Sequence, residues 1–166
     1  METLRAIENS GFGIWVRESG SLWSYPTIIF LHSLGLSFLV GVNVALDLRV
    51  LGVARRLPLA SLEQLFPIMW AGFWVNTVSG VALLIADAST MLVSVVFLVK
   101  MTCIVAAVID LVVLKRMLFA TVRSESPGLP MQAKVLAITS LVLWAGAITA
   151  GRLTAYLGPV AGLGGR

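Results

Sequence analysis

The sequence contains one histidine, His32, and one cysteine, Cys103, so few side chains can act as metal ligands or nucleophiles. A single histidine excludes a pair of histidine ligands on one haem or metal ion within the chain. A single cysteine excludes an internal disulfide and a cysteine-rich zinc or iron–sulfur site. His32 then has two interpretations. It is either a neutral imidazole hydrogen-bonded to Asn76 or Thr102 of a neighbouring helix, or an axial ligand of a haem or metal ion.

Three further polar residues, Asn76, Lys100 and Arg152, fall inside long apolar stretches, where ionisable groups are costly and usually face protein or water. Lys100 can hydrogen-bond to Asn76, pair with a bound anion such as a haem propionate, or extend to the surface. Arg152 can reach the boundary, or hold a lipid phosphate or cofactor carboxylate with both of its terminal nitrogens. Met101 lies near the height of His32, which makes it the candidate for a second axial haem ligand.

A second ionisable group, Asp47, Arg49 and Asp110, falls toward the other end of the apolar stretches. A buried carboxylate is costly unless it is paired, so a structural salt bridge with Arg49 or Lys115 is the simplest interpretation. A proton relay through Asp110 is the alternative, but no continuous chain of titratable residues supports it.

The composition indicates which elements carry these residues. The chain has 166 residues, of which 58% are hydrophobic and 12% charged, and its mean hydropathy is +0.97. Such a surface must face lipid, and a helix that crosses about 30 Å of hydrocarbon needs about 20 apolar residues. Four stretches have this length: 25–46, 65–86, 91–114 and 135–157. We predict an all-α fold, a bundle of four transmembrane helices.

The remaining segments predict the topology. Apolar residues recur at helical spacing within residues 1–24, which indicates an amphipathic helix at the membrane surface, whereas the glycine-rich residues 158–166 predict a flexible tail. Lys and Arg gather in connections 47–64 and 115–134 and are absent from 87–90, so the first two are expected in the cytoplasm. Both termini then lie on the periplasmic side of a bacterial inner membrane. We ascribe the net charge of +4 to these loops and expect no nucleic-acid partner.

Depth along the helices groups the polar residues. At about 1.5 Å per residue, His32 lies about 10 Å below the outer boundary, Lys100 about 14 Å, Asn76 about 15 Å and Arg152 about 8 Å. These four residues therefore share the outer half of the predicted bundle.

The chain resembles an uncharacterised bacterial family of small four-helix inner-membrane proteins in the segments WSYPTIIFLHSLGLSFLVG, DLRVLG, FLVKM and SLVLWAGAITAGRLTAYLG. The match covers nearly the whole chain. These proteins are distantly similar to copper-resistance membrane domains and to cytochrome b561-like bundles, which bind haem between helices. The resemblance implies as motif positions His32, Asp47, Arg49, Lys100, Arg152 and Tyr156. The haem-binding bundles use paired histidines, whereas here the third stretch ends in DLVVLKRML, without the expected second one.

The leading functional interpretation is a small cytochrome-like or accessory subunit of a membrane redox complex. In this interpretation His32 binds a b-type haem or serves as a polar anchor, and Lys100 and Arg152 pair with anions. One alternative is transport of a metal ion or small solute at a site formed by His32, Asn76 and Lys100, and another is a purely structural membrane subunit. The expected partners are lipid and either further copies of the chain or a larger membrane complex. We expect no catalytic activity of its own, because no nucleophile has a base and an orienting group at suitable positions.

Overall fold

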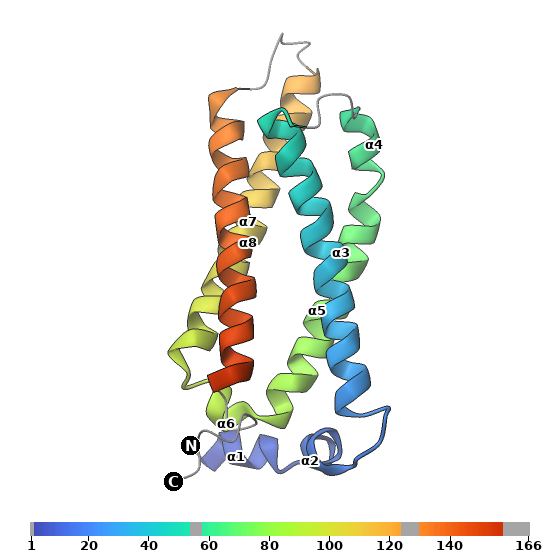
Figure 1. Cartoon of the computed structure of the whole chain (residues 1–166), viewed down its shortest axis with the longest axis vertical. Helices are drawn as coiled ribbons and strands as arrows, with labels where there is room; N and C mark the ends of the chain where they lie inside the picture. The colour runs from blue at the N-terminus through green and yellow to red at the C-terminus, as the bar shows by residue number, and fades with distance from the viewer. Residues whose placement is uncertain (1, 54–57, 124–129, 158–166) are drawn as a thin grey trace.

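A computed structural model of the chain describes residues 2–53, 58–123 and 130–157 (Figure 1). Within these ranges the chain forms helices and no β-strand, which confirms the all-α prediction. The helices are α1 (Glu2–Glu8), α2 (Gly11–Glu18), α3 (Tyr25–Leu51), α4 (Leu59–Glu63), α5 (Phe66–Ala86), α6 (Ala88–Met91), α7 (Val95–Arg123) and α8 (Met131–Leu157).

Four of these helices, α3, α5, α7 and α8, are long and apolar enough to cross a membrane. Pro26 and Pro67 stand in the first turns of α3 and α5, where a missing backbone N–H breaks no helical hydrogen bond. Beyond the predicted limits, α3 and α7 continue past residues 46 and 114, and α8 begins before residue 135. Hydropathy marks where the apolar run ends. A helix continues beyond that point because charged residues are good helix formers in the interfacial region.

The long helices pack as two antiparallel pairs, α3 with α5 and α7 with α8, and contacts between α3 and α8 join the pairs. Figure 1 shows α1, α2 and α6 across one end of the bundle, which we call the capped end. The closest approach within the first pair is at Gly35 and Gly72. A Cβ atom built on Gly35 would lie 2.6 Å from the backbone nitrogen of Asn76 and 2.7 Å from the carbonyl oxygen of Gly72. Helices α3 and α5 therefore touch backbone to backbone, as small residues allow in membrane bundles.

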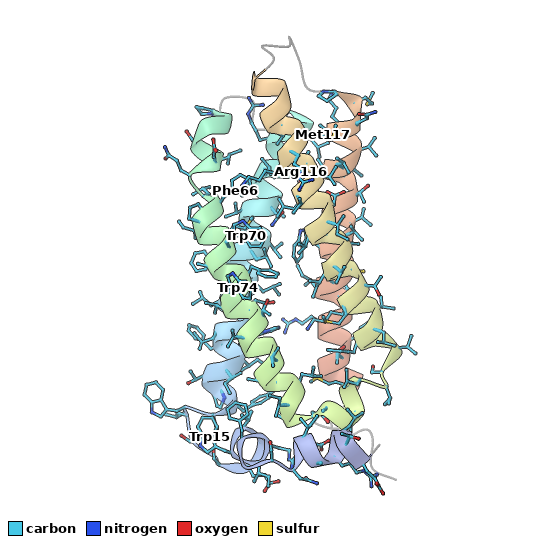
Figure 2. All side chains as sticks on the ribbon, turned by 180° about the vertical axis from the view of Figure 1, so that it is seen from behind. Trp15, Phe66, Trp70, Trp74, Arg116 and Met117 are labelled. Atoms are coloured by element: carbon cyan, nitrogen blue, oxygen red, sulfur yellow. The ribbon has the colours of Figure 1, made fainter. Side chains whose placement is uncertain are left out.

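The buried core lies mainly between α3, α7 and α8, around Leu39, Ala107, Leu114 and Trp144. Large apolar side chains also cover the outside of the bundle. Figure 2 shows Phe66, Trp70 and Trp74 in a row along α5, and Trp74 is 61% exposed. An exterior of this kind suits a bundle surrounded by lipid. The protein is a membrane protein with four spanning helices.

The single interfacial helix predicted for residues 1–24 is divided into α1 and α2. The break falls at Ser10, which has an extended backbone and whose hydroxyl accepts a 3.2 Å hydrogen bond from the backbone N–H of Gly13. Ser10 is the N-cap of α2, so the capping hydrogen bond replaces continuation of α1. Residues 87–90, expected as a simple turn, contain most of the short helix α6. The predicted tail at 158–166 lies outside the described residues.

Candidate functional site

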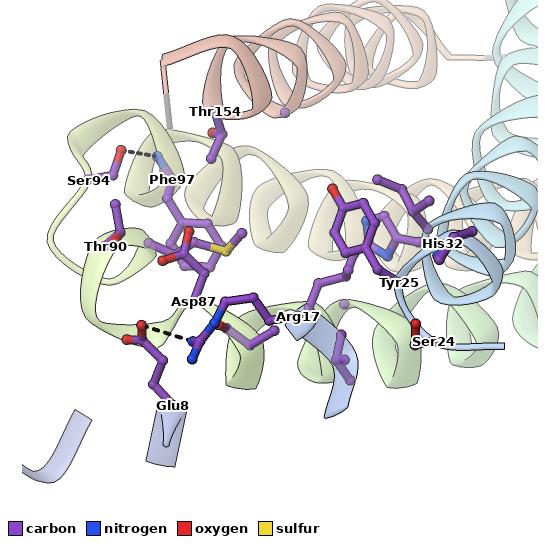
Figure 3. Close-up of a pocket in the computed structure, with 18 of the residues that line it drawn as sticks. Glu8, Arg17, Ser24, Tyr25, His32, Asp87, Thr90, Ser94, Phe97 and Thr154 are labelled. Carbon is purple, nitrogen blue, oxygen red and sulfur yellow. Dashed lines mark hydrogen bonds and ion pairs between the residues drawn. The ribbon is translucent and has the colours of Figure 1, made fainter. Parts of the chain in front are cut away.

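A cavity of about 1050 Å³ lies near the capped end and is lined by residues of α1, α2, α3, α5, α6, α7 and α8 (Figure 3). Most of its lining is apolar, and its ionisable residues are Glu8, Arg17, Tyr25, His32, Asp87 and Lys100. Each pair of long helices packs tightly within itself, and α3 joins α8, but α5 and α7 make no extensive contact in the described chain. The cavity is therefore a space between the two helix pairs.

His32 is held by α5 through its Nδ1 atom, which lies 3.0 Å from the backbone oxygen of Asn76 and 3.2 Å from the hydroxyl oxygen of Ser79. The Ser79 hydroxyl donates its own proton to the Val75 carbonyl at 2.6 Å, so it acts as an acceptor toward His32. Nδ1 also lies 3.3 Å from the side-chain nitrogen of Asn76, which is a donor, but its nearest partner is a carbonyl, which can only accept, so we assign the proton of the neutral ring to Nδ1. The Nε2 atom then carries the lone pair that can bind a metal or accept a proton.

Asn76 completes this arrangement, because its side-chain amide donates a 2.8 Å hydrogen bond to the backbone oxygen of His32. The hydrogen bonding between His32 and Asn76 that the sequence suggested is therefore present. Gly80 leaves space for the imidazole, since a Cβ atom at that position would lie 3.1 Å from Cε1 of His32. The polar contacts and the close helix approach together fix the orientation of the ring.

Lys100 lies on α7, half-buried, and lines the same cavity as His32. Its stem passes along α8 at Gly151, where an added Cβ atom would lie 3.6 Å from Cε and 3.9 Å from Nζ of the lysine. The ammonium group is within electrostatic range of the His32 ring. In the described part of the chain no carboxylate forms an ion pair with Lys100. The cavity thus combines a fixed imidazole with a cationic group from the opposite helix pair.

At the capped end, Glu8 of α1 and Arg17 of α2 form an ion pair at 3.3 Å (Figure 3). Arg17 also donates a 3.2 Å hydrogen bond to the backbone oxygen of Ala86, at the end of α5. The backbone N–H of Ser89 donates to Glu8 at 3.2 Å. Hydrogen bonding from the Ser89 side chain is the main cause that lowers the pKa of Glu8 below its ordinary value, and its backbone N–H and Arg17 act in the same direction. These contacts hold α1 and α2 against the mouth of the cavity.

Two predicted cofactor-binding residues lie elsewhere. Met101 is 41% exposed and Arg152 is exposed, and neither lines the cavity. Each follows directly after a residue that does line it, Lys100 or Gly151, and one step along a helix turns the side chain by about 100°. Met101 is therefore not placed to ligate an ion that His32 holds from inside the cavity. Met101 and Arg152 lie at a depth similar to that of His32, but their side chains do not face the same cavity.

Ser79 and Gly80, as well as the Glu8–Arg17 pair, were not predicted as site residues. Ser79 lies three residues after Asn76, on the same face of α5, so helical spacing was an available signal for it. The pairing of Glu8 with Arg17 depends on the break at Ser10, which turns α2 relative to α1.

Asp47 and Asp110 are buried in the half of the bundle remote from this cavity. The Ser140 side chain hydrogen-bonds to the Asp47 carboxyl, and Asp110 is close enough to interact with Asp47 electrostatically. Arg49, half-buried on α3, and Lys115, whose ammonium lies 4.3 Å from the centre of the Phe66 ring, are also in this half. Asp47 on α3 and Asp110 on α7 thus lie in one buried region of the bundle.

Comparison with known proteins found no matching family model, curated protein or solved structure. The function is therefore inferred from the two polar sites within the membrane bundle.

Proposed function

We propose that this membrane protein is a small cytochrome-like subunit that binds a b-type haem in the cavity at the capped end. The proposal depends above all on the hydrogen bond from Nδ1 of His32 to the backbone oxygen of Asn76. Histidines that ligate metals almost always donate their other ring N–H to a carbonyl or carboxylate, which fixes the tautomer and raises the basicity of the ligating nitrogen. His32 has this arrangement at the edge of a largely apolar cavity.

The size and charge of the cavity also suit such a group. Its volume of about 1050 Å³ is at the upper end of the roughly 300–1,000 Å³ typical of small-molecule sites. The apolar lining would exclude water from a macrocycle, and the Lys100 ammonium would pair with a propionate carboxylate. When bound, haem supplies one-electron redox chemistry, while the protein sets the axial ligand and the polarity around it.

His32 supplies the one imidazole in the cavity lining, Met101 does not line the cavity, and Met91 lines it from α6. His32 would then ligate the iron, with Met91 as the candidate second protein ligand, and we expect the iron to accept a small exogenous ligand. Carbon monoxide added to the reduced protein should change its absorption spectrum.

The test is an absorption spectrum of the detergent-purified protein, oxidised and reduced with dithionite, together with iron analysis of the same sample. We expect a Soret band that shifts on reduction and is lost in His32→Ala, while Met101→Leu retains it. Lys100→Met should lower the haem content of a correctly folded protein, and Arg152→Met, which changes an exposed cation outside the cavity, should not. A protein that stays colourless and iron-free after incubation with haem would refute the proposal.

We infer further that the capped end faces the periplasm of a bacterial inner membrane. Arg49, Arg116 and Lys134 lie on the parts of α3, α7 and α8 remote from the capped end, and Lys and Arg favour the cytoplasmic side. Labelling of single cysteines in intact cells by a membrane-impermeant maleimide tests this orientation, with Cys103 replaced by Ser. A cysteine at Asn9 should be labelled and one at Lys134 should not, and the reverse pattern would contradict the inference.

A further inference from the structure

A second polar group lies in the half of the bundle away from the cavity, where α3, α7 and α8 meet. Its members are all at most 6% exposed: Asn43, Asp47, Asp110, Ser140 and Trp144. Four of their side-chain atoms have no hydrogen-bond partner in the described chain, namely Asn43 Oδ1, Asp47 Oδ2, Asp110 Oδ2 and Trp144 Nε1. Buried polar atoms are nearly always paired, because leaving one unpaired costs more than about 1 kcal/mol.

The helix register places these atoms close together. The hydrogen bond between Ser140 and Asp47 sets α3 and α8 at the same level. The two helices are antiparallel (Figure 1), so one turn back along α3 and one turn forward along α8 brings Asn43 level with Trp144. On the antiparallel pair α7 and α8, Cys103 lies at Gly146. Two turns forward along α7 and nearly two turns back along α8 therefore bring Asp110 level with Ser140. One buried region thus contains three unpartnered acceptor oxygens, on Asn43, Asp47 and Asp110, and one unpartnered donor, the Trp144 indole N–H.

Two cations lie nearby, and each has interactions of its own. Lys115, one turn beyond Asp110 on α7, lies over the Phe66 ring, and Arg49 on α3 is half-buried and has interactions of its own. Helix α5 carries no ionisable residue and contributes Met69, whose sulfur accepts a 3.4 Å hydrogen bond from the Asn43 amide. On α8 the nearest ionisable residue is Lys134, which is exposed. The group to be explained is therefore a pair of neighbouring carboxyls in an apolar setting.

We propose that Asp47 and Asp110 together retain a proton and form a proton-binding site within the membrane. Two neighbouring carboxylates in an apolar medium cannot both be ionised, so the pair retains a proton under conditions in which an exposed aspartate has none. The protonated carboxyl becomes a donor, in a region whose unpartnered oxygens lack one. Asp47 stands four residues before the end of α3, or about 6 Å along its axis, so the proton exchanges with water at the end opposite the cavity.

A proton suits this region better than a metal ion. The described residues contain no group of three or more His, Cys, Asp or Glu that could hold a metal. Ala107 and Leu114 flank Asp110 at helical spacing on α7, and Ala137 precedes Ser140 by about one turn on α8; all three are fully buried and offer no side-chain oxygen. A proton needs no coordination shell, whereas a metal ion would lose most of its hydration without replacement.

The experiment is infrared difference spectroscopy of the whole protein in detergent across pH, observing the carbonyl stretch of protonated carboxylic acids. We expect a band that persists at neutral pH in the wild type and shifts when the chain carries isotope-labelled aspartate. Asp47→Asn or Asp110→Asn should lower the pH at which the remaining carboxyl is half protonated by about one unit or more, because the like charge is removed. The double variant should lack the band, and Asp87→Asn, which changes the aspartate at the cavity, should leave it unchanged.

Three results would overturn the proposal. The first is the absence of an aspartyl band from the wild-type protein at neutral pH. This measurement does not depend on whether any variant folds. The second is a band that survives in the double variant. The third is loss of the band when sodium is added at constant pH, since this would make the pair a sodium site. None of these results depends on haem, so they separate this proposal from the one for the cavity.

Discussion

Gly35→Ala tests whether the close contact of α3 with α5 supports the cavity site. The new methyl group would lie 2.6 Å from the backbone nitrogen of Asn76 and 2.7 Å from the backbone oxygen of Gly72. Both are backbone atoms, so no side-chain rotation relieves the overlap. The two helices must separate by about 0.8 Å to reach 3.4 Å, the lower limit of ordinary van der Waals contact. Overpacking of this kind costs about 1–3 kcal/mol, and we expect a loss within that range.

The same displacement reaches His32. Its Nδ1 atom is 3.0 Å from the Asn76 carbonyl oxygen, and a separation of about 0.8 Å would take that distance beyond hydrogen-bonding range. Gly35→Ala should therefore lower haem content as well as stability, although Gly35 does not line the cavity.

Gly41→Ala is the matched control, because it makes the same change on the same helix at a position with nothing within 4 Å of the new Cβ atom. Alanine favours a helix over glycine by about 1 kcal/mol, so this variant should be neutral or more stable. Equilibrium unfolding of both variants in mixed detergent, followed by circular dichroism, gives the comparison. If Gly35→Ala were as stable as Gly41→Ala, backbone contact between α3 and α5 would not support the fold.

Two further predictions concern the capped end. Ser10→Ala removes the N-cap of α2 and should cost about 1 kcal/mol locally, seen as faster amide hydrogen exchange in α2, whereas Ser19→Ala, at the other end of α2, should have little effect. The lowered pKa of Glu8 means that its carboxylate stabilises the folded state above the ordinary glutamate pKa of 4.5, and that this contribution is lost as the pH falls through the lower folded value. Proteolysis of the α1 segment should accelerate over that acid range in the wild type, and a Glu8→Gln protein that kept the same pH dependence would exclude Glu8 as its cause.

Hydropathy was sufficient to predict the four spanning helices, because a helix in lipid needs an unbroken apolar run of known length. Depth along each run also grouped His32, Asn76, Lys100 and Arg152 in one half of the bundle, and the structure brings the first three to one site while Arg152 does not line the cavity. These predictions use only the rise per residue, which is nearly constant in α-helices.

Rotation about the helix axis could not be predicted in this way. Met101 is beside Lys100 in the sequence, yet it is exposed while Lys100 lines the cavity. The rotation of α7 about its axis depends on its packing against Gly146 and Gly151 of α8. The uniformly apolar sequence of α7 does not indicate which of its sides packs there. A site defined by facing side chains therefore needed the structure.

The cavity site and the carboxyl pair both include residues of α3. The distance between them limits the electrostatic effect that a charge at one site can have on the other. His32 and Asp47 are fifteen residues apart, which is about 22 Å along the helix. At that distance, with an effective dielectric constant of about 20, a unit charge in the cavity changes the proton affinity of Asp47 by about 0.7 kcal/mol, or half a pH unit. The infrared midpoint of the carboxyl pair should therefore differ by no more than about half a pH unit between wild type and His32→Ala. A larger shift would mean that α3 transmits a structural change between the sites, because direct electrostatics across this distance could not produce it.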